Sequence, residues 1–492
     1  MPVLSRPHNL YIGVEYPSLP DINEGMRVGN AAHFDFIVSP LAHPRNVRQP
    51  KDVRVSEEPW TRSDLFLEPK IWTTAIVGSM SPWIAPDAAS PALREMSRAA
   101  FLQELAWASH LAVYAALLPP PSCLGCSQYA GILQQRISAG LTSTIWIKVP
   151  LVYRIETAQG TEYRDGWHAW NELHSACEYS KDMGIALEFT ELAHVTDQEL
   201  TRWIAEPVKV VLLSSDVFMA NKAGYPVLSR RHKQLLLQLF RHKVQVVVSV
   251  NPKVDSSPPD HYIEWVGRAF KAMPALSQAE LFSEPYNDYL QQPLQPLKDN
   301  LESNTYATFE KDPVKYVNYE EAVLACLQDK MKETGRTSFV IMVVGAGRGP
   351  LVAGSRSAYR RAGLKDVEVW AVEKNPNAVV TLRCRKRDEK WDDVIVIAHD
   401  MRTWQAPKKA DILVSELLGS FGDNELSPEC LDGAQRFLAD DGVSIPQFYY
   451  STARPVSDFP LWHACRAFDD LEHLETPYVV QPHAAFLSDT GD

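Results

Sequence analysis

Short apolar segments alternate with polar, helix-forming stretches throughout the first 250 residues, and this alternation restricts the fold more than any other feature of the chain. The stretches between the segments include helical spacing over 97–111 and 196–205. The eight predicted strands span residues 11–15, 34–38, 74–78, 113–117, 145–149, 185–189, 208–213 and 244–250. Eight βα units of this size predict a TIM-barrel-like (β/α)8 domain, with another α/β arrangement as the alternative.

The predicted strand ends indicate what such a barrel would do. A TIM-barrel enzyme carries its catalytic groups at the carboxyl ends of the strands. At these ends, from Tyr16 to Asn251, the sequence has no cluster of metal-ligand residues and no nucleophile beside a base. Glu191 and Asp216 lie near strand ends, but each is isolated. We therefore expect this domain to position or recruit other molecules.

Length and charge limit the number of domains and the kind of partner. A chain of 492 residues is too long for one hydrophobic core, so two or three domains are expected. The formal net charge of -12 argues against direct nucleic-acid binding, because that activity needs a basic face. A basic substrate or partner agrees better with an acidic chain.

The cysteines and the apolar runs indicate a compartment. Seven cysteines are scattered without the spacing of a secreted disulfide framework. No apolar run approaches the ~20 residues of a membrane span, and the first residues lack a signal-peptide core. These observations predict an intracellular protein outside the membrane. The pair Cys123 and Cys126 has no second pair, so no metal site is expected there.

A change in composition between Ser256 and Asn300 marks a domain junction, because prolines and glutamines interrupt regular structure there. A second α/β pattern then begins with a helix over 314–331. Further strands are expected over 339–344, 367–372, 394–397 and 411–414. This alternation predicts a doubly wound, Rossmann-like sheet. Beyond Pro446, strands are expected over 448–452 and near 478–480.

The first strand of this second pattern ends in a glycine-rich turn, Gly-Ala-Gly-Arg-Gly, over residues 345–349. Gly345 and Gly347 would let the backbone approach a ligand closely, although a plain strand-to-helix turn can carry the same glycines. Pro350 suits the first position of a helix, but it stands where the dinucleotide fingerprint requires glycine or alanine. The turn alone is therefore a weak signal.

The next two strand ends strengthen this signal. Glu373 ends the second strand, where an acid can accept hydrogen bonds from ribose hydroxyls. Asp400 and Met401 follow the third strand and suit the amino group and the ring of adenine. Three successive strand ends thus predict an adenosine site. They leave open whether the adenosine belongs to a nicotinamide cofactor or to a methyl donor.

Glutamates stand at both ends of the loop after the fourth strand, at Glu416 and Glu425. Such a loop can bring two carboxylates onto one ligand, and the planar fork of an arginine guanidinium pairs with carboxylates in a bidentate manner. A sulfonium donor and a guanidinium repel by about 4 kcal/mol at ~4 Å for an effective dielectric near 20. Two acids offset this repulsion, so the loop favours methyl transfer to arginine.

Several segments carry a specific resemblance to a known family. The loop Ser-Glu-Leu-Leu-Gly-Ser-Phe and its continuation to residue 433 resemble the double-glutamate loop of the type II protein arginine methyltransferase family, also called the protein arginine methyltransferase five family, whose members form symmetric dimethylarginine. The resemblance extends to residues 345–351, 372–378, 301–306 and 309–316. Weaker likeness at 81–84 and 224–229 reaches into the N-terminal half.

The resemblance implies a role for individual residues. S-adenosylmethionine would be the methyl donor, without a metal. Glu416 and Glu425 would hold the substrate arginine, and Phe309 would favour symmetric over asymmetric dimethylation. The residues that would contact the donor are Tyr306, Lys315, Tyr316, Gly345, Gly347, Glu373, Asp400 and Met401.

The resemblance also implies partners and a domain plan. Residues 1–285 would form a TIM-barrel-like domain that docks a WD-repeat propeller protein, and 286–312 a linker that covers the cofactor. Residues 313–446 would form the Rossmann-like catalytic domain, and 447–492 the start of a C-terminal β-barrel. Substrates with Arg- and Gly-rich tails, such as histones and splicing factors, a homo-oligomer, and activity in the cytoplasm and nucleus are further expectations.

Two alternatives to an active methyltransferase stay open at this stage. The complete family barrel walls the arginine site, whereas residues 447–492 would supply its beginning. A non-catalytic form that binds the donor and the WD-repeat partner without turnover is therefore one alternative. The other is a nicotinamide-dependent oxidoreductase, which would use the same glycine turn and Glu373 but leave the loop from Glu416 to Glu425 unexplained.

Overall fold

The chain divides into two compact units in the computed structural model, which describes residues 10–44, 60–140, 144–157, 160–192, 194–249, 259–419, 422–468, 470–483 and 486–487. Unit 1 comprises Met1–Asp288, Pro455–Ala467 and Pro482–Asp492. Unit 2 comprises Tyr289–Arg454 and Phe468–Gln481. The main division thus follows Asp288, close to the domain boundary that we expect at residue 285.

Unit 1 contains a closed barrel of eight parallel strands, so the predicted TIM-barrel-like fold is confirmed. The barrel strands are β1 (Ile12–Glu15), β2 (Phe36–Pro40), β3 (Ile76–Ser79), β4 (Ala115–Leu118), β5 (Ile145–Pro150), β8 (Met183–Glu188), β9 (Val208–Ser214) and β12 (Gln245–Ser249). Each overlaps one of the eight predicted segments. Val250 and Asn251, at the expected end of the last strand, lie outside the described residues.

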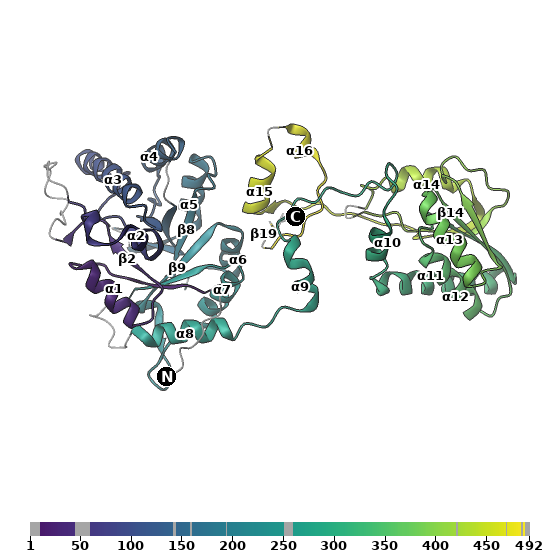
Figure 1. Cartoon of the computed structure of the whole chain (residues 1–492), viewed down its shortest axis with the longest axis horizontal. Helices are drawn as coiled ribbons and strands as arrows, with labels where there is room; N and C mark the ends of the chain where they lie inside the picture. Colours follow the sequence, from purple (N-terminus) through teal and green to yellow (C-terminus); the bar gives the residue numbers. More distant parts are fainter. Residues whose placement is uncertain are drawn as a thin grey trace. The chain divides into compact units, whose positions relative to one another are not determined.

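Helices surround this barrel, as Figure 1 shows. They are α1 (Ile22–Ala31), α2 (Pro69–Ala75), α3 (Pro91–Leu111), α4 (Ser127–Ser138), α5 (Gly166–Ala176), α6 (Asp197–Thr201), α7 (Arg230–Phe240) and α8 (Pro259–Lys271), with α9 (Gln278–Ser283) after them. Short 3-10 helices span Asp64–Phe66, Arg202–Ala205, Ser215–Val217 and Glu284–Tyr286. Apolar side chains such as Phe36, Trp146 and Val210 fill a buried cluster among the strands.

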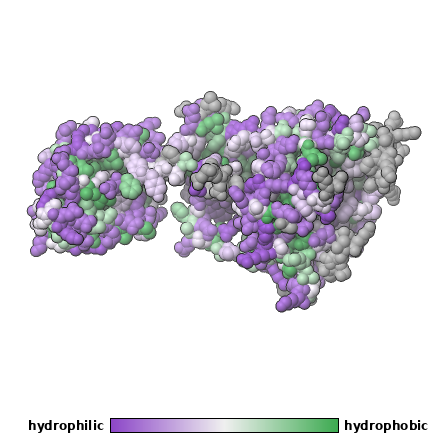
Figure 2. All heavy atoms as spheres, turned by 180° about the vertical axis from the view of Figure 1, so that it is seen from behind, coloured by the Kyte–Doolittle hydropathy of each residue, from purple (hydrophilic) through white to green (hydrophobic). Residues whose placement is uncertain are grey.

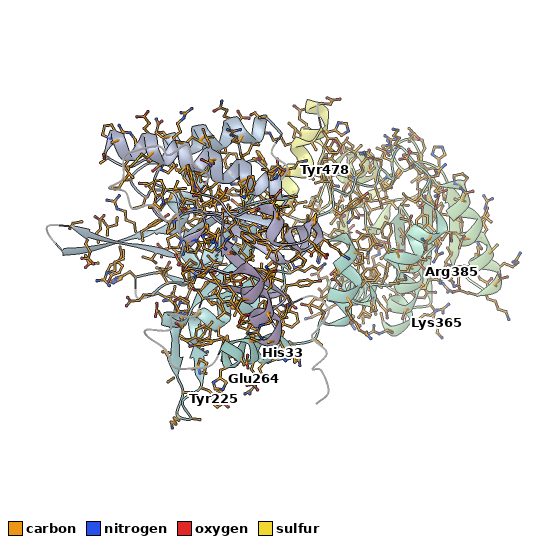
Figure 3. All side chains as sticks on the ribbon, turned by 60° about the vertical axis from the view of Figure 1, so that its left-hand side comes forward. His33, Tyr225, Glu264, Lys365, Arg385 and Tyr478 are labelled. Atoms are coloured by element: carbon orange, nitrogen blue, oxygen red, sulfur yellow. The ribbon has the colours of Figure 1, made fainter. Side chains whose placement is uncertain are left out.

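Two antiparallel hairpins in unit 1 were not expected from the sequence. They pair β6 (Val152–Thr157) with β7 (Gly160–Asp165), and β10 (Phe218–Ala220) with β11 (Pro226–Leu228). The strands of the first hairpin are largely polar and exposed, and those of the second are only three residues long, so neither hairpin has the longer apolar runs that identify buried strands. Tyr225, beside the second hairpin, and Glu264 of α8 are labelled in Figure 3 and line the same surface groove.

Unit 2 is built on a five-stranded sheet in the order β15-β14-β13-β16-β17, with every pair parallel. The strands are β13 (Ser338–Val344), β14 (Asp366–Glu373), β15 (Val394–Ala398), β16 (Ala410–Ser415) and β17 (Leu438–Ile445). The helices are α10 (Ser303–Phe309), α11 (Pro313–Thr334), α12 (Pro350–Arg361), α13 (Pro376–Asp388) and α14 (Ser427–Gln435). Separate apolar cores cover the two faces of the sheet, which confirms the predicted Rossmann-like architecture.

The ends of α11 follow from the local sequence. Asp312 caps the helix by accepting hydrogen bonds from the backbone N–H groups of Val314 and Lys315, at 3.1 and 3.2 Å. Pro313 occupies the first turn, where its missing N–H group costs nothing. Gly335 ends the helix in a left-handed conformation, with φ of 69°. Lys315 thus lies in the capped first turn of α11.

The segment after the fourth strand of unit 2 differs from expectation. Strand β17 was not predicted, because Asp440, Asp441 and Gly442 resemble a turn; in the structure they occupy an irregularity in the register with β16. The strand predicted over 448–452 is wrong, since these residues have no regular secondary structure. Phe448 and Tyr450 are exposed there instead of pairing with a neighbouring strand.

The described residues beyond 455 form short elements. They are β18 (Val456–Ser457), α15 (Phe459–Arg466), α16 (Leu471–Glu475) and β19 (Phe486–Leu487), with β18 and β19 paired antiparallel. The β segment expected near 478–480 amounts to a single bridge between Gln291 and Val479. The start of a C-terminal β-barrel in this region stays a prediction.

Two further features are the hydropathy of the surface and the length and apolarity of the helices. Figure 2 shows a largely hydrophilic surface on the face in view. Among the described residues, no helix is both long enough and apolar enough to cross a membrane.

Candidate active site

A cavity of 210 Å³ opens in unit 2 where the strand order reverses between β13 and β16. Ligands of open parallel sheets bind at this position, beyond the carboxyl ends of the strands. All of the predicted site residues line this one cavity, namely Tyr306, Phe309, Lys315, Tyr316, Gly345, Gly347, Glu373, Asp400, Met401, Glu416 and Glu425. The structure therefore brings them together, while the role of each stays a prediction.

Glu373 joins the glycine turn to the end of β14. Its two oxygens accept hydrogen bonds from the backbone N–H groups of Gly347 and Asn375, each at 2.7 Å. The residue is 6% exposed, and burial raises the pKa of its carboxyl although the two N–H donors oppose that shift. Because a carboxylate has about four acceptor positions, oxygens that hold these amides retain capacity for ribose hydroxyls.

The glycine turn needs its glycines for space and for backbone conformation. Gly345 has φ of 70°, and a Cβ there would lie 2.7 Å from the Leu417 side chain. Gly347 has φ of 53°, and its Cβ would lie 3.2 Å from the ring of Tyr306. Side chains at either position would require a strained backbone and would crowd the cavity.

Helix α10 covers the cavity through contacts that the sequence did not reveal. The Asn375 side chain donates hydrogen bonds to the Leu301 carbonyl and to the Tyr306 hydroxyl, both at 3.1 Å. Asn375 is 2% exposed, so the donor of both hydrogen bonds is buried. They hold Leu301, just before α10, and Tyr306, within α10, against the end of β14. The sequence could have identified Asn375, because it lies two residues after Glu373 in the segment 372–378 that resembles the family.

A second connection fixes the other side of α10. Arg348, in the glycine turn, donates from Nε and Nη2 to the two carboxylate oxygens of Glu310, at 2.9 and 2.5 Å. It also donates to the Ser303 hydroxyl at 3.0 Å. Paired hydrogen bonds of this kind fix geometry as well as charge. Arg385 of α13, labelled in Figure 3, donates in turn to the Arg348 carbonyl at 3.0 Å.

The third strand end differs in detail from the predicted adenine site. Asp400 accepts hydrogen bonds from the backbone N–H and the guanidinium of Arg402, at 2.9 and 2.8 Å. These bonds lower the pKa of the Asp400 carboxyl and keep it ionised. Met401 is 9% exposed and packs toward the glycine turn. Asp400 thus has a structural partner in addition to any ligand.

The double-glutamate loop brings two acids to the cavity beyond β16. Gly419 and Gly422 form an antiparallel bridge inside this loop, while Ser420 and Phe421 lie outside the described residues. Glu425 is half-buried, and burial raises the pKa of its carboxyl, with the charge of Glu416 acting in the same direction. The site therefore holds two carboxylates whose charges interact.

Lys315, for which the resemblance implies a contact with the donor, contacts Glu416 in this structure. Its Nζ lies 3.0 Å from Oε2 of Glu416. The same Nζ lies 5.6 Å from the ring centre of Phe309 and 5.2 Å from that of Tyr316. Phe309 thus lines the same cavity as Glu416 and Glu425, the two acids called the clamp below, where the resemblance places a product-determining aromatic side chain.

Metal binding has no support in the described part of the chain, where no group of three or more His, Cys, Asp or Glu side chains could hold an ion. Cys123 and Cys126 are free thiols. Burial and nearby acids raise the pKa of Cys126 to about 12, which disfavours the thiolate that zinc would need.

Comparison with known proteins gives matches to both units. Family models described as the PRMT5 TIM barrel domain and the PRMT5 arginine-N-methyltransferase match residues 33–319 and 277–445. Protein arginine N-methyltransferase 5 of Oryza sativa subsp. japonica is 41% identical over 96% of this chain and 77% of its own length. The Xenopus laevis protein of the same name is 42% identical over 92% of this chain and 74% of its own length.

A solved structure is matched more weakly. The crystal structure of Arabidopsis thaliana protein arginine methyltransferase 10 is 26% identical over 22% of this chain and 30% of that chain, with a TM-score of 0.20. The sequence matches are far more extensive.

Proposed function

Because this chain belongs to the protein arginine N-methyltransferase 5 family, we propose that it transfers methyl groups from S-adenosylmethionine to arginine side chains of proteins. One observation carries the proposal: a single cavity is lined by the glycine turn and Glu373 together with Glu416 and Glu425. The first pair suits an adenosine, and the second pair suits a guanidinium. The family favours a methyl donor over a nicotinamide cofactor.

The two glutamates would orient the guanidinium and offset its charge. A guanidinium with carboxylates on two sides has most of its donors engaged, so one terminal nitrogen faces the sulfonium. The acids also reduce the repulsion between the two cations. This arrangement would make the attack of nitrogen on the methyl carbon effectively intramolecular.

The reaction requires an acceptor for one proton. As the N–C bond forms and the S–C bond breaks, the sulfonium becomes a neutral thioether and the methylated nitrogen must lose a proton to regain a planar guanidinium. Glu425 is the acid in the clamp whose pKa is raised by burial and by Glu416, so it suits transient protonation better than an ordinary carboxylate.

Product and substrate are further parts of the proposal. Phe309 lines the cavity within reach of Lys315 and supports a symmetric product, since the resemblance assigns this aromatic position to the choice between dimethylarginines. Basic Arg- and Gly-rich tails such as those of histones and splicing factors suit a chain with net charge of -12.

The barrel unit supports a recruiting role. Its closed strands carry no metal-ligand group among the described residues, and its exterior offers helices and hairpins to a partner. We propose that it docks a WD-repeat protein, as the resemblance implies. Oligomer formation and presence in the cytoplasm and nucleus stay predictions.

A transfer assay tests the proposed function. The chain is incubated with methyl-labelled S-adenosylmethionine and an Arg- and Gly-rich peptide, and the product is analysed by fragmentation mass spectrometry. We expect label on arginine, as mono- and symmetric dimethylarginine. Donor binding and partner capture without transfer would instead support the non-catalytic scaffold, and binding of NAD without S-adenosylmethionine would support an oxidoreductase.

A further inference from the structure

Lys315 is paired with Glu416, which is also one of the two acids predicted to hold the substrate arginine. The lysine leaves the capped first turn of α11, and its Nζ lies 3.0 Å from Glu416. Both side chains are about one quarter exposed, at 24% and 23%, so water screens the pair incompletely. The rings of Phe309 and Tyr316 flank the ammonium at 5.6 and 5.2 Å.

Substrate arginine and Lys315 compete for the same carboxylate. A bidentate grip of the guanidinium on Glu416 needs both oxygens, so the guanidinium would share Oε2 with the Lys315 ammonium, and the two cations would repel each other there. Glu425 is the second acid beside the guanidinium site; burial and then the charge of Glu416 raise its pKa, while the charge of Lys315 opposes that shift. The affinity for the substrate guanidinium should therefore rise when the Lys315 ammonium pairs with another anion.

The methyl donor supplies such an anion. Its amino-acid carboxylate is attached next to the sulfonium, so it must lie close to the clamp for the methyl group to reach the guanidinium. Three lysine and arginine side chains line the cavity within the described residues, namely Lys315, Arg348 and Lys374. Arg348 is held by Glu310 and Ser303. The charge of Lys374 adds to the effect of Arg402 in lowering the pKa of Asp400, at the third strand end.

We infer that Lys315 exchanges between Glu416 and the carboxylate of the methyl donor, so that donor binding releases Glu416 to the substrate arginine. This inference rests on the proposed function and adds to it an order of binding, donor before arginine. Because coupling between two binding equilibria is reciprocal, bound arginine also tightens donor binding by the same factor.

The exchange can be measured in the wild-type chain by isothermal titration calorimetry. An arginine peptide is titrated in the presence of S-adenosylhomocysteine or of 5′-methylthioadenosine. Both ligands have a neutral thioether, which removes sulfonium repulsion, but the second lacks the amino-acid part and its carboxylate. We expect the peptide to bind about tenfold more tightly with S-adenosylhomocysteine, a typical coupling factor.

Variants then assign the effect to Lys315. In Lys315→Met, the two nucleosides should support equal peptide binding, because there is no ammonium to exchange. Lys315→Arg should retain part of the difference. Lys311→Met is the matched control, since it removes the same charge from an exposed position near the start of α11 and should keep the full difference.

The outcomes separate this inference from the proposed function. Equal peptide affinity with both nucleosides in the wild-type chain overturns the exchange, and so does a difference that persists in Lys315→Met. If Lys315→Met does not fold, the wild-type comparison still decides. A wild-type chain that binds neither S-adenosylhomocysteine nor the peptide contradicts the proposed function itself.

Discussion

In both units charged side chains lie toward the carboxyl ends of parallel strands, but these side chains have different partners. In the barrel, Lys148 of β5 pairs with Glu188 at the end of the neighbouring β8, with Nζ and Oε1 2.8 Å apart. In unit 2, Glu373 accepts hydrogen bonds from backbone N–H groups, and Lys315 pairs with Glu416 and acts on Glu425 only through its charge.

The difference shows that charge at strand ends is not sufficient for a site. In the barrel, the charges of Glu188 and Glu15 together raise the pKa of Lys148 against the effect of burial, so these acids already have a cation as their partner. In unit 2, Glu416 and Glu425 line an open cavity, so they can accept a cationic ligand. Variants in the two units can break or sharpen this contrast.

The largest effect on ligand binding is expected at Glu373. Glu373→Ala removes the acceptor of two backbone N–H groups and the predicted ribose partner, and hydrogen bonds to a charged group contribute about 1.5–3 kcal/mol each. We expect the Kd for S-adenosylhomocysteine to rise by about a thousandfold, or about 4 kcal/mol. Calorimetry measures this loss.

Glu368→Ala is the matched control for Glu373, because it changes an acid of the same strand that faces Lys408 instead of the cavity. Its donor affinity should match that of the wild-type chain. Donor binding by Glu373→Ala that is as tight as in this control would remove Glu373 from the donor site.

A smaller effect concerns the acid stability of the barrel unit, where His174 is buried as a neutral side chain. Burial lowers its pKa to about 4, from the ordinary 6.5. Between these values the unfolded chain takes up a proton that the folded chain resists, so stability falls as the pH falls from about 6.5 to 4. The loss attributable to His174 is on the order of 3 kcal/mol.

Urea unfolding at several pH values, followed by fluorescence of the barrel tryptophans, checks this prediction. In His174→Gln the loss of stability below pH 6.5 should shrink. His33→Asn changes an exposed histidine with φ of 64°, a conformation that asparagine tolerates, and should leave the pH dependence intact. An unchanged pH dependence in His174→Gln would show that other groups control acid unfolding.

The smallest effect is the pH dependence of arginine binding, because a protonated Glu425 is a poorer partner for a guanidinium. The pKa of this carboxyl is raised above 4.5. Peptide affinity should therefore be full above the raised pKa and fall by up to about tenfold per pH unit below it. Calorimetry with S-adenosylhomocysteine present measures this slope. Glu425→Gln should weaken binding at neutral pH and flatten the slope; a slope that remains would assign the titration to another group.

The sequence predicted the barrel and the sheet where strands are buried on both faces, since such strands are nearly continuous apolar runs. It missed the polar hairpin from Val152 to Asp165, and it missed β17 because Asp440 to Gly442 resemble a turn. The strand expected over 448–452 failed because an apolar, aromatic run alone does not provide a pairing partner.

The site was predicted as far as chain order shows it. Gly347, Glu373 and Asp400 follow successive strands of a parallel sheet, so a common edge was expected. The contacts of Asn375 with Tyr306 and of Lys315 with Glu416 join residues far apart in the chain, and no local pattern predicts them. The partner of Lys315 is therefore information that the folded structure adds.

One comparison of methyl-transfer rates tests most directly whether the acids at the strand ends of unit 2, and not the ion pair of the barrel, perform the chemistry. The double variant Glu416→Gln with Glu425→Gln is assayed beside Lys148→Gln with Glu188→Gln, using labelled S-adenosylmethionine and an arginine peptide. We predict that the first loses transfer by about a thousandfold or more, while the second keeps the wild-type rate. Transfer that survives in the first double variant would contradict the account.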